Sequence, residues 1–434
     1  MIYRTKVKQT LQSEKKLKQI KLLFLVIVTA FSKVVISQDA LDKTLNNSEL
    51  SKRVEILADE INQLKAYQMS VSKNEGVFGL SPSASKVYHI PRGLSVGGYG
   101  EVTYRHFRAE NQDGDSIDKD PVSEVLRNII YIGYKFNDKW LVNMELEIEH
   151  VSQVYTEFMY LDYLHSDEFN FRAGLMLHPI GFVNVLHEPT VFLGVLRPQV
   201  ETVIIPTTWR SLGVGMFGGS GKSSYKLYFM NGMNAEGFST SSNRGARKRG
   251  GHYSDGAEKT QNQRSTTGAI VFRYDYQLND NLTLGTSGLI GQASGENANL
   301  DQRMITLQGE YTRKAHKLRF LTVSNQFANA DDWNELNSNN VNSEQRGSYL
   351  EYSYSIITND GQRYVPFIRH EVMNLQHDRA QAVADDKSLE RTNTTIGISF
   401  FPHEQVVFKA DYTLNKNEDT TGVDEFALGL GYNF

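Results

Sequence analysis

The chain has 434 residues but no cysteine, only 9 prolines and a formal net charge of just -4. Without cysteine it cannot form disulfides, so its stability must come from backbone hydrogen bonds and packing. The small net charge argues against nucleic acid or another highly charged polymer as a partner. We also expect no metal and no cofactor, since no group of residues has a ligand spacing typical of such a site.

The chain also lacks an apolar run of the roughly 20 residues that a membrane-spanning helix requires. Its mean hydropathy of -0.43 is low. This value does not exclude a membrane β-barrel, because every second residue of such a barrel faces water in the lumen. The sequence is instead rich in glycine, tyrosine and phenylalanine, with 34, 22 and 22 residues, and this composition suits a barrel.

The N-terminus has the pattern of a secretory signal peptide over residues 1–37. A basic segment precedes the apolar run Leu22–Phe31, and we place the cleavage site after Ser37. We therefore expect export of the mature chain, and no lipid anchor, since no cysteine follows the run.

Residues 38–69 have the periodicity of a short coiled-coil helix. Apolar residues recur four, three, four and three positions apart, at Leu50, Val54, Leu57, Ile61 and Leu64. One interpretation is a periplasmic helix that joins copies of the chain into a homotrimer. The alternative is an amphipathic helix that packs on its own barrel. Residues 70–92, rich in Ser, Gly and Pro, are predicted to be a linker.

Residues 93–434 alternate strand patterns with turn signals up to the last residue. In Glu425–Phe434 every second side chain is apolar and the last is aromatic, whereas the side chains between them are small or polar. About 16 such segments predict an all-β fold, a transmembrane antiparallel β-barrel closed between its first and last strands. Taken alone, the last segment also suits the edge strand of a soluble sandwich.

The connections between the predicted strands alternate between short and long. Turns of about three to five residues, most with Asn, Asp or Gly, are followed by longer polar loops. A sandwich or propeller rarely has this alternation, which favours a barrel in the Gram-negative outer membrane with the long loops outside the cell. Outer-membrane lipid and lipopolysaccharide are then expected partners. The basic stretch Arg244–Arg249 has three interpretations: a funnel for anions, a contact with lipopolysaccharide phosphates, or a solvated, mobile loop.

Parity within the strands separates an apolar outer face from a charged inner face. The charged residues expected to line the lumen are Glu101, Arg105, Arg127, Lys135, Glu145, Glu147, Glu149, Arg172, Lys226, Arg273 and Lys409. One interpretation is a ladder of cations that accepts anions, since basic rings select anions in pores. The alternative is that basic and acidic rows pair across neighbouring strands.

The third long connection, Pro179–Thr208, is about half apolar and rich in proline. A long loop with side chains of the buried type is usually packed and functional. We therefore predict that it folds back into the barrel and narrows the pore. The residues predicted to form the constriction are His187, Glu188, Arg197, Glu201 and Arg210.

Three motifs of this region carry a resemblance to a known family. His-Glu-Pro-Thr from His187, Arg197-Pro198 and Ile-Ile-Pro-Thr-Thr-Trp-Arg from Ile204 follow the opening strand Gly-Leu-Ser-Val-Gly-Gly-Tyr-Gly-Glu101. Together they resemble a Gram-negative outer-membrane porin family related to the phosphate-selective porins (porin O/P-like). The resemblance implies a trimeric, 16-stranded channel with its third loop inside. Inward glutamates such as Glu145 depart from the basic lumen of the phosphate-selective members.

The predicted function is that of a porin, a passive diffusion channel for small hydrophilic solutes, with anions such as phosphate among the candidates. We expect no enzymatic activity, because the sequence has no nucleophile elbow, no His-Glu-x-x-His and no Walker A motif. His150 and Ser152 lie close together at a strand end but fit hydrogen-bonded loop residues. Two alternatives are a barrel-embedded enzyme and an adhesion or scaffold barrel whose loops bind a partner.

Overall fold

A computed structural model describes residues 52–56, 58–59, 76–235, 238, 266–381 and 383–434. The chain divides into two compact units, residues 1–67 and 68–434. In the first unit, residues 52–56 and 58–59 are helical, and Val54 is 59% exposed. The predicted signal peptide, the other four heptad positions and the basic stretch Arg244–Arg249 lie outside the described residues. No helix in the described ranges is both long and apolar enough to cross a membrane.

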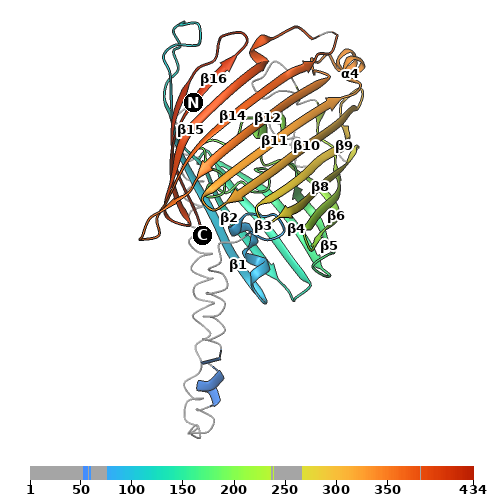
Figure 1. Cartoon of the computed structure of the whole chain (residues 1–434). Helices are drawn as coiled ribbons and strands as arrows, with labels where there is room; N and C mark the ends of the chain where they lie inside the picture. The colour runs from blue at the N-terminus through green and yellow to red at the C-terminus, as the bar shows by residue number, and fades with distance from the viewer. Residues whose placement is uncertain (1–51, 57, 60–75, 236–237, 239–265, 382) are drawn as a thin grey trace, which may run out of the picture. The chain divides into compact units, whose positions relative to one another are not determined.

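The second unit is built on one sheet of 17 hydrogen-bonded strands that closes on itself (Figure 1). The strands are β1 (Gly93–Phe107), β2 (Val122–Lys135), β3 (Trp140–Glu149), β4 (Gln153–Leu164), β5 (Asn170–Leu177), β6 (Arg210–Ser220), β7 (Ser223–Asn231), β8 (Gly268–Asn279), β9 (Leu282–Ala293), β10 (Leu300–Arg313), β11 (His316–Phe327), β12 (Glu344–Tyr354), β13 (Ile356–Ile357), β14 (Arg363–Asp378), β15 (Glu390–His403), β16 (Val406–Asn417) and β17 (Glu425–Asn433). The two-residue β13 follows β12 after one residue and pairs with the same neighbour, β14. Because β12 and β13 together occupy one position in the sheet, sixteen strands form the barrel. Every pairing between these strands is antiparallel, as predicted.

The barrel closes between β1 and β17, from Tyr99 opposite Asn433 to Phe107 opposite Glu425. At the end of the chain the closure continues, because Gly98 and Phe434 exchange both backbone hydrogen bonds, at 2.9 and 3.0 Å. No edge is left at the last strand. The prediction of a closed barrel is thus confirmed, and the soluble edge strand is excluded.

The turns at the two ends of the barrel differ in length. At the end where Phe434 lies, the connections have two to five residues, as in residues 280–281 and 358–362. At the other end most are longer and include α4 (Ala330–Asn337) and the single turn η4 (Lys387–Leu389). One exception is residues 150–152, a three-residue turn between β3 and β4 at the long-loop end.

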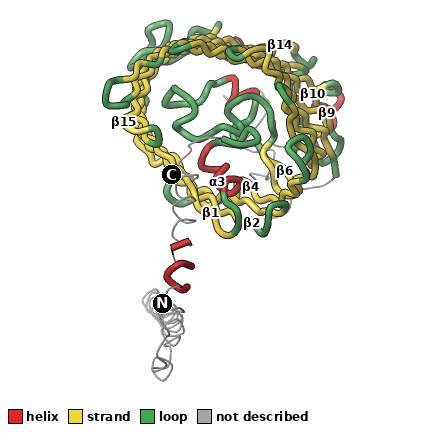
Figure 2. The backbone as a smooth tube through the Cα atoms, turned by 60° about the horizontal axis from the view of Figure 1, so that its bottom comes forward, coloured by secondary structure: helices red, strands yellow, loops and turns green. Residues whose placement is uncertain are grey.

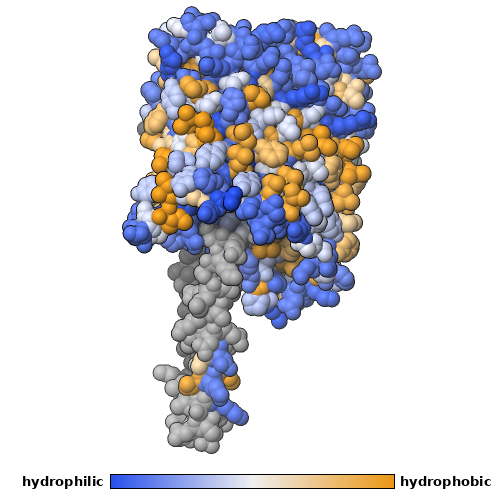
Figure 3. Space-filling view, in the orientation of Figure 1, coloured by the Kyte–Doolittle hydropathy of each residue, from blue (hydrophilic) through white to orange (hydrophobic). Residues whose placement is uncertain are grey.

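The outer face of the strands is apolar, and Figure 3 shows these side chains gathered over the strands below a hydrophilic rim. On β17, for example, Phe426, Leu428 and Leu430 are exposed while Ala427 between them is buried. Exposed and half-buried aromatic side chains collect near the short-turn end. Their contacts include Tyr134 with Phe136, Tyr364 with Phe400, and Tyr432 with Phe434. Apolar bands flanked by aromatic residues are typical of barrels in lipid.

Figure 2 shows a helix and loop segments inside the ring of strands. The helix is α3 (Pro82–His89), which lies in the range predicted to be a linker. It begins with Ser81 and a proline at its first position, a favourable N-terminus because proline already has a helical φ. Ala84 and Val87 are buried, and Asn143 on β3 donates to the Ala84 carbonyl at 2.8 Å. Residues 82–89 of the predicted linker therefore form a helix that packs against the inner face of the barrel.

Candidate channel constriction

The third loop, residues 178–209 between β5 and β6, lies inside the barrel as predicted, because its backbone is hydrogen-bonded to β14 and β16. Its backbone is bound by side chains of the opposite barrel wall. Asp411 on β16 accepts the Val195 N–H at 2.6 Å, and Glu371 on β14 accepts the Val200 N–H at 3.0 Å. Lys409 donates to two further loop carbonyls at 2.8 and 2.9 Å. The loop thus spans the lumen and is held on both sides.

Buried apolar side chains also hold the third loop against the strands. Ile180, Val183, Ile204 and Ile205 of the loop are no more than 2% exposed and pack in one core with inner-face residues of the strands. Burying each such side chain contributes roughly 1.5–3 kcal/mol relative to exposure. The apolar sequence of the loop is therefore explained by a core that lies inside the barrel.

Glu201 and Asn184 stabilise the path of the loop itself. Glu201, on the short turn η2 (Val200–Ile204), accepts the N–H groups of Phe182 and Val183 at 2.7 and 2.8 Å. Its second oxygen accepts the Tyr349 hydroxyl of β12 at 2.6 Å. Asn184 donates to the carbonyls of His178 and Trp209, the two ends of the loop, at 2.7 and 3.0 Å. Both polar side chains therefore serve loop geometry.

Glu188 connects three parts of the fold. Its Oε1 accepts the N–H groups of Ser83 and Ala84, in the first turn of α3, at 2.8 and 3.2 Å. Its Oε2 accepts from the Asn433 amide of β17 at 2.8 Å. The Ser81 side chain makes no capping hydrogen bond, so the carboxylate of Glu188 caps the helix in its place. Burial raises the pKa of Glu188 to about 7.

His187 faces two carboxylates on adjacent strands. Its Nε2 lies 3.2 Å from Glu145 on β3 and 3.7 Å from Glu157 on β4. Arg210, at the start of β6, forms an ion pair of 3.0 Å with the same Glu157. Burial lowers the pKa of His187 to about 3, and Arg197 and Arg127 act in the same direction. His187, Glu188, Glu201 and Arg210 are thus brought inside the barrel, but all four are at most 3% exposed.

A cavity of about 390 Å³ lies between the third loop and the wall formed by β1, β2, β14, β15, β16 and β17. Arg197 is the one predicted constriction residue that lines it. The charged side chains around the cavity are Glu101, Arg105, Arg127, Arg197, Arg369, Glu371, Asp411 and Glu425. Four guanidinium groups and four carboxylates therefore line the same cavity.

Three of these guanidinium groups are paired with carboxylates. Arg105 binds Glu425 at 2.6 Å, Arg127 lies 3.2 Å from Glu101, and Arg369 contacts Glu371 at 2.9 Å. Arg197 instead donates to the Thr207 hydroxyl and to the His187 carbonyl. Among the described residues, Arg197 has no carboxylate within ion-pair distance.

The other residues predicted to line the lumen lie on the inner face, where many of them bind α3 or the third loop. Arg172 forms a two-bond ion pair with Asp162 and contacts Tyr88 of α3 at 2.8 Å. Lys135 donates to the Tyr88 carbonyl, and Arg273 to the Gly181 carbonyl. Glu147 lies 3.8 Å from Arg127. Glu149 is partly exposed near His150, and Lys226 approaches Gly79 before α3.

The predicted set lacked several residues that the fold brings to the cavity, among them Arg369, Glu371 and Glu425. Arg369 and Glu371 share one face of β14, and Ile368, His370 and Val372 lie on the other, so strand parity was a usable signal for both. Glu157 lies next to a register shift on β3–β4, and this irregularity obscures its parity. Within the described residues, Glu145, Glu157 and His187 form a cluster whose ligand atoms lie within 4.8 Å of one another.

Solved structures with a similar fold are outer-membrane proteins. They include OmpF of Salmonella typhi in complex with daunomycin (TM-score 0.52, 10% identity, 79% of this chain and 98% of that one) and the outer membrane channel DcaP of Acinetobacter baumannii (0.50, 11%, 79% and 98%). A third is the trimer form of in-vitro folded OmpT of Vibrio cholerae (0.50, 10%, 80% and 100%). At these identities the likeness shows the fold alone, a barrel like that of outer-membrane porins.

No protein-family model matches the chain. A sequence relative is an uncharacterized protein of Aquifex aeolicus (strain VF5), 32% identical over 378 residues. The alignment covers 82% of this chain and 83% of the relative, and so extends over most of both proteins. The chain therefore belongs to the same family as this Aquifex aeolicus protein, with the barrel fold of outer-membrane porins.

Proposed function

We propose that this protein is a porin of the Gram-negative outer membrane, a passive channel for small hydrophilic solutes with a preference for anions. In this proposal the short turns face the periplasm, residues 1–37 are removed as a signal peptide, and residues 38–69 form a periplasmic helix. The apolar, aromatic-flanked outer face of the barrel supports placement in lipid.

The observation that carries the proposal is the charged cavity of about 390 Å³ between the third loop and the wall. Charged groups retain water, so this space is suited to hydrated ions and polar solutes. An enzyme would instead require a nucleophile and base arranged for reaction. At the candidate pair, Ser152 donates to the His150 carbonyl at 3.5 Å, and the His150 ring contacts Glu124 at 2.9 Å. This arrangement does not favour the enzymatic alternative.

The anion preference rests on Arg197. The other three guanidinium groups of the cavity are neutralised by carboxylates at 2.6 to 3.2 Å. Arg197 has only neutral acceptors among the described residues, so its charge is available to a passing anion. The four carboxylates of the cavity argue for weak selection among small anions, phosphate included, rather than for a dedicated phosphate site.

The other four predicted constriction residues then stabilise the position of the third loop. His187, Glu188, Glu201 and Arg210 fix the third loop and α3 against the strands. By holding the loop, they keep Arg197 at the cavity. We extend the proposal to a homotrimer, a state that the trimer form of OmpT shows for a barrel of this kind.

Single-channel recording in planar bilayers tests this function. The full mature protein should give stable conductance steps, in groups of three equal steps if a trimer inserts. Under a KCl gradient, the reversal potential should have the sign of chloride selectivity, and adding phosphate should change the current. Heat-unfolded protein in the same detergent is the control for artefactual pores. A correctly folded protein that gives no channels would overturn the proposal.

A further inference from the structure

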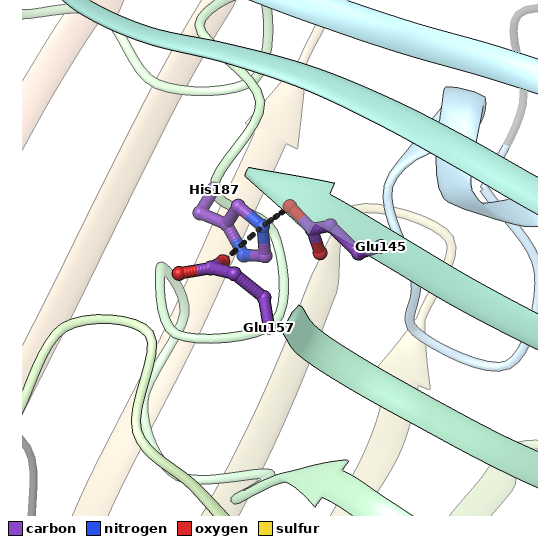
Figure 4. Close-up of side chains that lie close together, drawn as sticks. All are labelled: Glu145, Glu157 and His187. Carbon is purple, nitrogen blue, oxygen red and sulfur yellow. Dashed lines mark hydrogen bonds and ion pairs between the residues drawn. The ribbon is translucent and has the colours of Figure 1, made fainter. Parts of the chain in front are cut away.

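Glu145, Glu157 and His187 come from three separate elements and meet in the interior of the barrel. Figure 4 shows both carboxyl groups beside the imidazole ring, one from β3 and one from β4. His187 Nε2 is 3.2 Å from Glu145 Oε1 and 3.7 Å from Glu157 Oε2. All three residues are at most 1% exposed. They are therefore shielded from bulk water, unlike acidic clusters on protein surfaces.

The hydrogen bond on the other side of the ring decides which nitrogen faces the carboxylates as a possible ligand. His187 Nδ1 lies 3.0 Å from the Asn184 carbonyl, which can only accept, so Nδ1 carries a hydrogen. A backbone carbonyl on the second nitrogen is the usual way to orient a metal-binding histidine. The lone pair of Nε2 then points at two carboxylate oxygens. A proton or a cation must lie between these atoms for the contact to be attractive.

An unpartnered oxygen points to a ligand independently of this geometry. Glu145 is fully buried, and its Oε2 has no hydrogen-bond partner in the described structure. Glu157 Oε1 is bound by Arg210 at 3.0 Å, but its Oε2 likewise accepts no hydrogen bond there. A buried carboxylate oxygen without a donor costs about 1–3 kcal/mol. A cation bound by Glu157 Oε2 and by both oxygens of Glu145 would remove this cost at both residues.

We propose that Glu145, Glu157 and His187 bind a divalent first-row transition-metal ion, with Zn²⁺ as the best fit, and thereby fasten the third loop to the barrel wall. Zinc accepts imidazole nitrogen and carboxylate oxygen at about 2.0–2.2 Å in tetrahedral geometry. Two such ligands are then about 3.3–3.5 Å apart, close to the separations of 3.2 and 3.7 Å here. Calcium and magnesium prefer all-oxygen sites. The site does not depend on the proposed transport function.

Metal content of the full, folded protein tests the site. Protein in detergent is incubated with Zn²⁺, freed of excess metal and measured by inductively coupled plasma mass spectrometry. We expect about one tightly held Zn²⁺ per chain and at least a tenfold loss of affinity in His187→Gln, because a ligand is lost. Glu351→Gln, a buried carboxylate on β12, is the matched control and should retain the metal. Co²⁺ in place of Zn²⁺ should give the visible absorption of a four-coordinate site in the wild type and in Glu351→Gln, and this absorption should be absent in His187→Gln.

A second measurement covers the case in which His187→Gln fails to fold. The thermal midpoint of the wild-type barrel should fall on treatment with a chelator and recover with Zn²⁺ but not with Mg²⁺, because ligand binding stabilises the folded state. The double variant Glu145→Gln/Glu157→Gln should show no such response. Equal zinc retention in wild type and His187→Gln, or a wild type without retained zinc and without a chelator effect, would show a proton-mediated contact and overturn the proposal.

Discussion

The Oε1 atom of Glu188 lies 2.8 Å from the backbone nitrogen of Ser83, across 105 positions of sequence. This contact places a carboxylate of the third loop at the N-terminus of a helix that precedes the barrel strands. The same side chain binds Asn433 next to the end of the chain. Glu188 therefore connects the third loop, helix α3 and the last strand of the barrel.

Replacing Glu188 with alanine should release α3. Two helix N–H groups would lose their acceptor, so we expect a loss of about 1–3 kcal/mol in the free energy of unfolding. Denaturant unfolding measures this loss, and a new tryptic cut after Lys86 would show that the helix has left the interior. Glu188→Gln retains an acceptor and should behave more like the wild type. Equal stability and no new cut in Glu188→Ala would contradict the capping role.

Stability should depend on pH through the same residue. Burial raises the pKa of Glu188 to about 7 from its ordinary 4.5, so between these values the folded protein holds a proton that the unfolded chain has lost. The free energy of unfolding should therefore fall as the pH rises from 4.5 to 7, by at most about 3 kcal/mol for one group. The unfolding free energies of wild type and Glu188→Gln at several pH values measure this effect. The difference between the two proteins should change from pH 4.5 to 7 and stay constant below pH 4.5. A constant difference from pH 4.5 to 7 would contradict the shifted pKa.

Reversal of the charge at Arg197 should change ion selectivity. In Arg197→Glu we expect the anion-to-cation permeability ratio to fall by a factor on the order of 5–30. The substitution changes the side-chain charge by two units. At about 4 Å from an ion in water, such a change is worth about 1–2 kcal/mol, which corresponds to this factor. Reversal potentials under a salt gradient give this ratio. Arg346→Glu, an exposed position that does not line the cavity, is the control. Unchanged selectivity in Arg197→Glu would place the selecting charge elsewhere.

A side chain at Gly98 should impair barrel closure. A Cβ there would lie 2.3 Å from the Ile129 carbonyl oxygen and 2.7 Å from the Phe434 ring. Gly98→Val should therefore displace the terminal aromatic residue and lower the unfolding free energy by about 1–3 kcal/mol. The folded fraction and the denaturant midpoint give the result. Val96→Leu, on the same strand at a half-exposed position, should be neutral, and a neutral Gly98→Val would exclude this steric role.

Disruption of the heptad stripe should weaken the oligomer without unfolding the barrel. The double variant Leu57→Glu/Ile61→Glu places charges where the predicted helices would meet, so it should shift the mass measured by light scattering toward the monomer. Lys52→Ala/Lys65→Ala changes the same segment off the stripe and serves as the control. The same oligomer in all three proteins would show that this helix is irrelevant to assembly.

The sequence by itself determined the strands and the closure of the barrel. Both rest on local patterns: side chains alternate faces with period two, turn residues mark the strand ends, and the apolar stripe ends on Phe434. The inward position of the third loop was also predictable, because Ile180, Val183 and Ile204 would otherwise be exposed to water. Helix α3 could have been found from Ser81-Pro82, although its composition resembles that of a linker.

Only the tertiary structure decided which charged residues meet. Strand parity indicates that a side chain points inward, but its partner depends on strand order, register and the path of the loop across the lumen. Glu145 and Glu157 converge on His187, and Asp411 binds Val195 across 216 positions. Of the five predicted constriction residues, four hold the third loop or α3 in place, and only Arg197 lines the cavity. Such pairings are fixed by distances in space, which no local periodicity encodes.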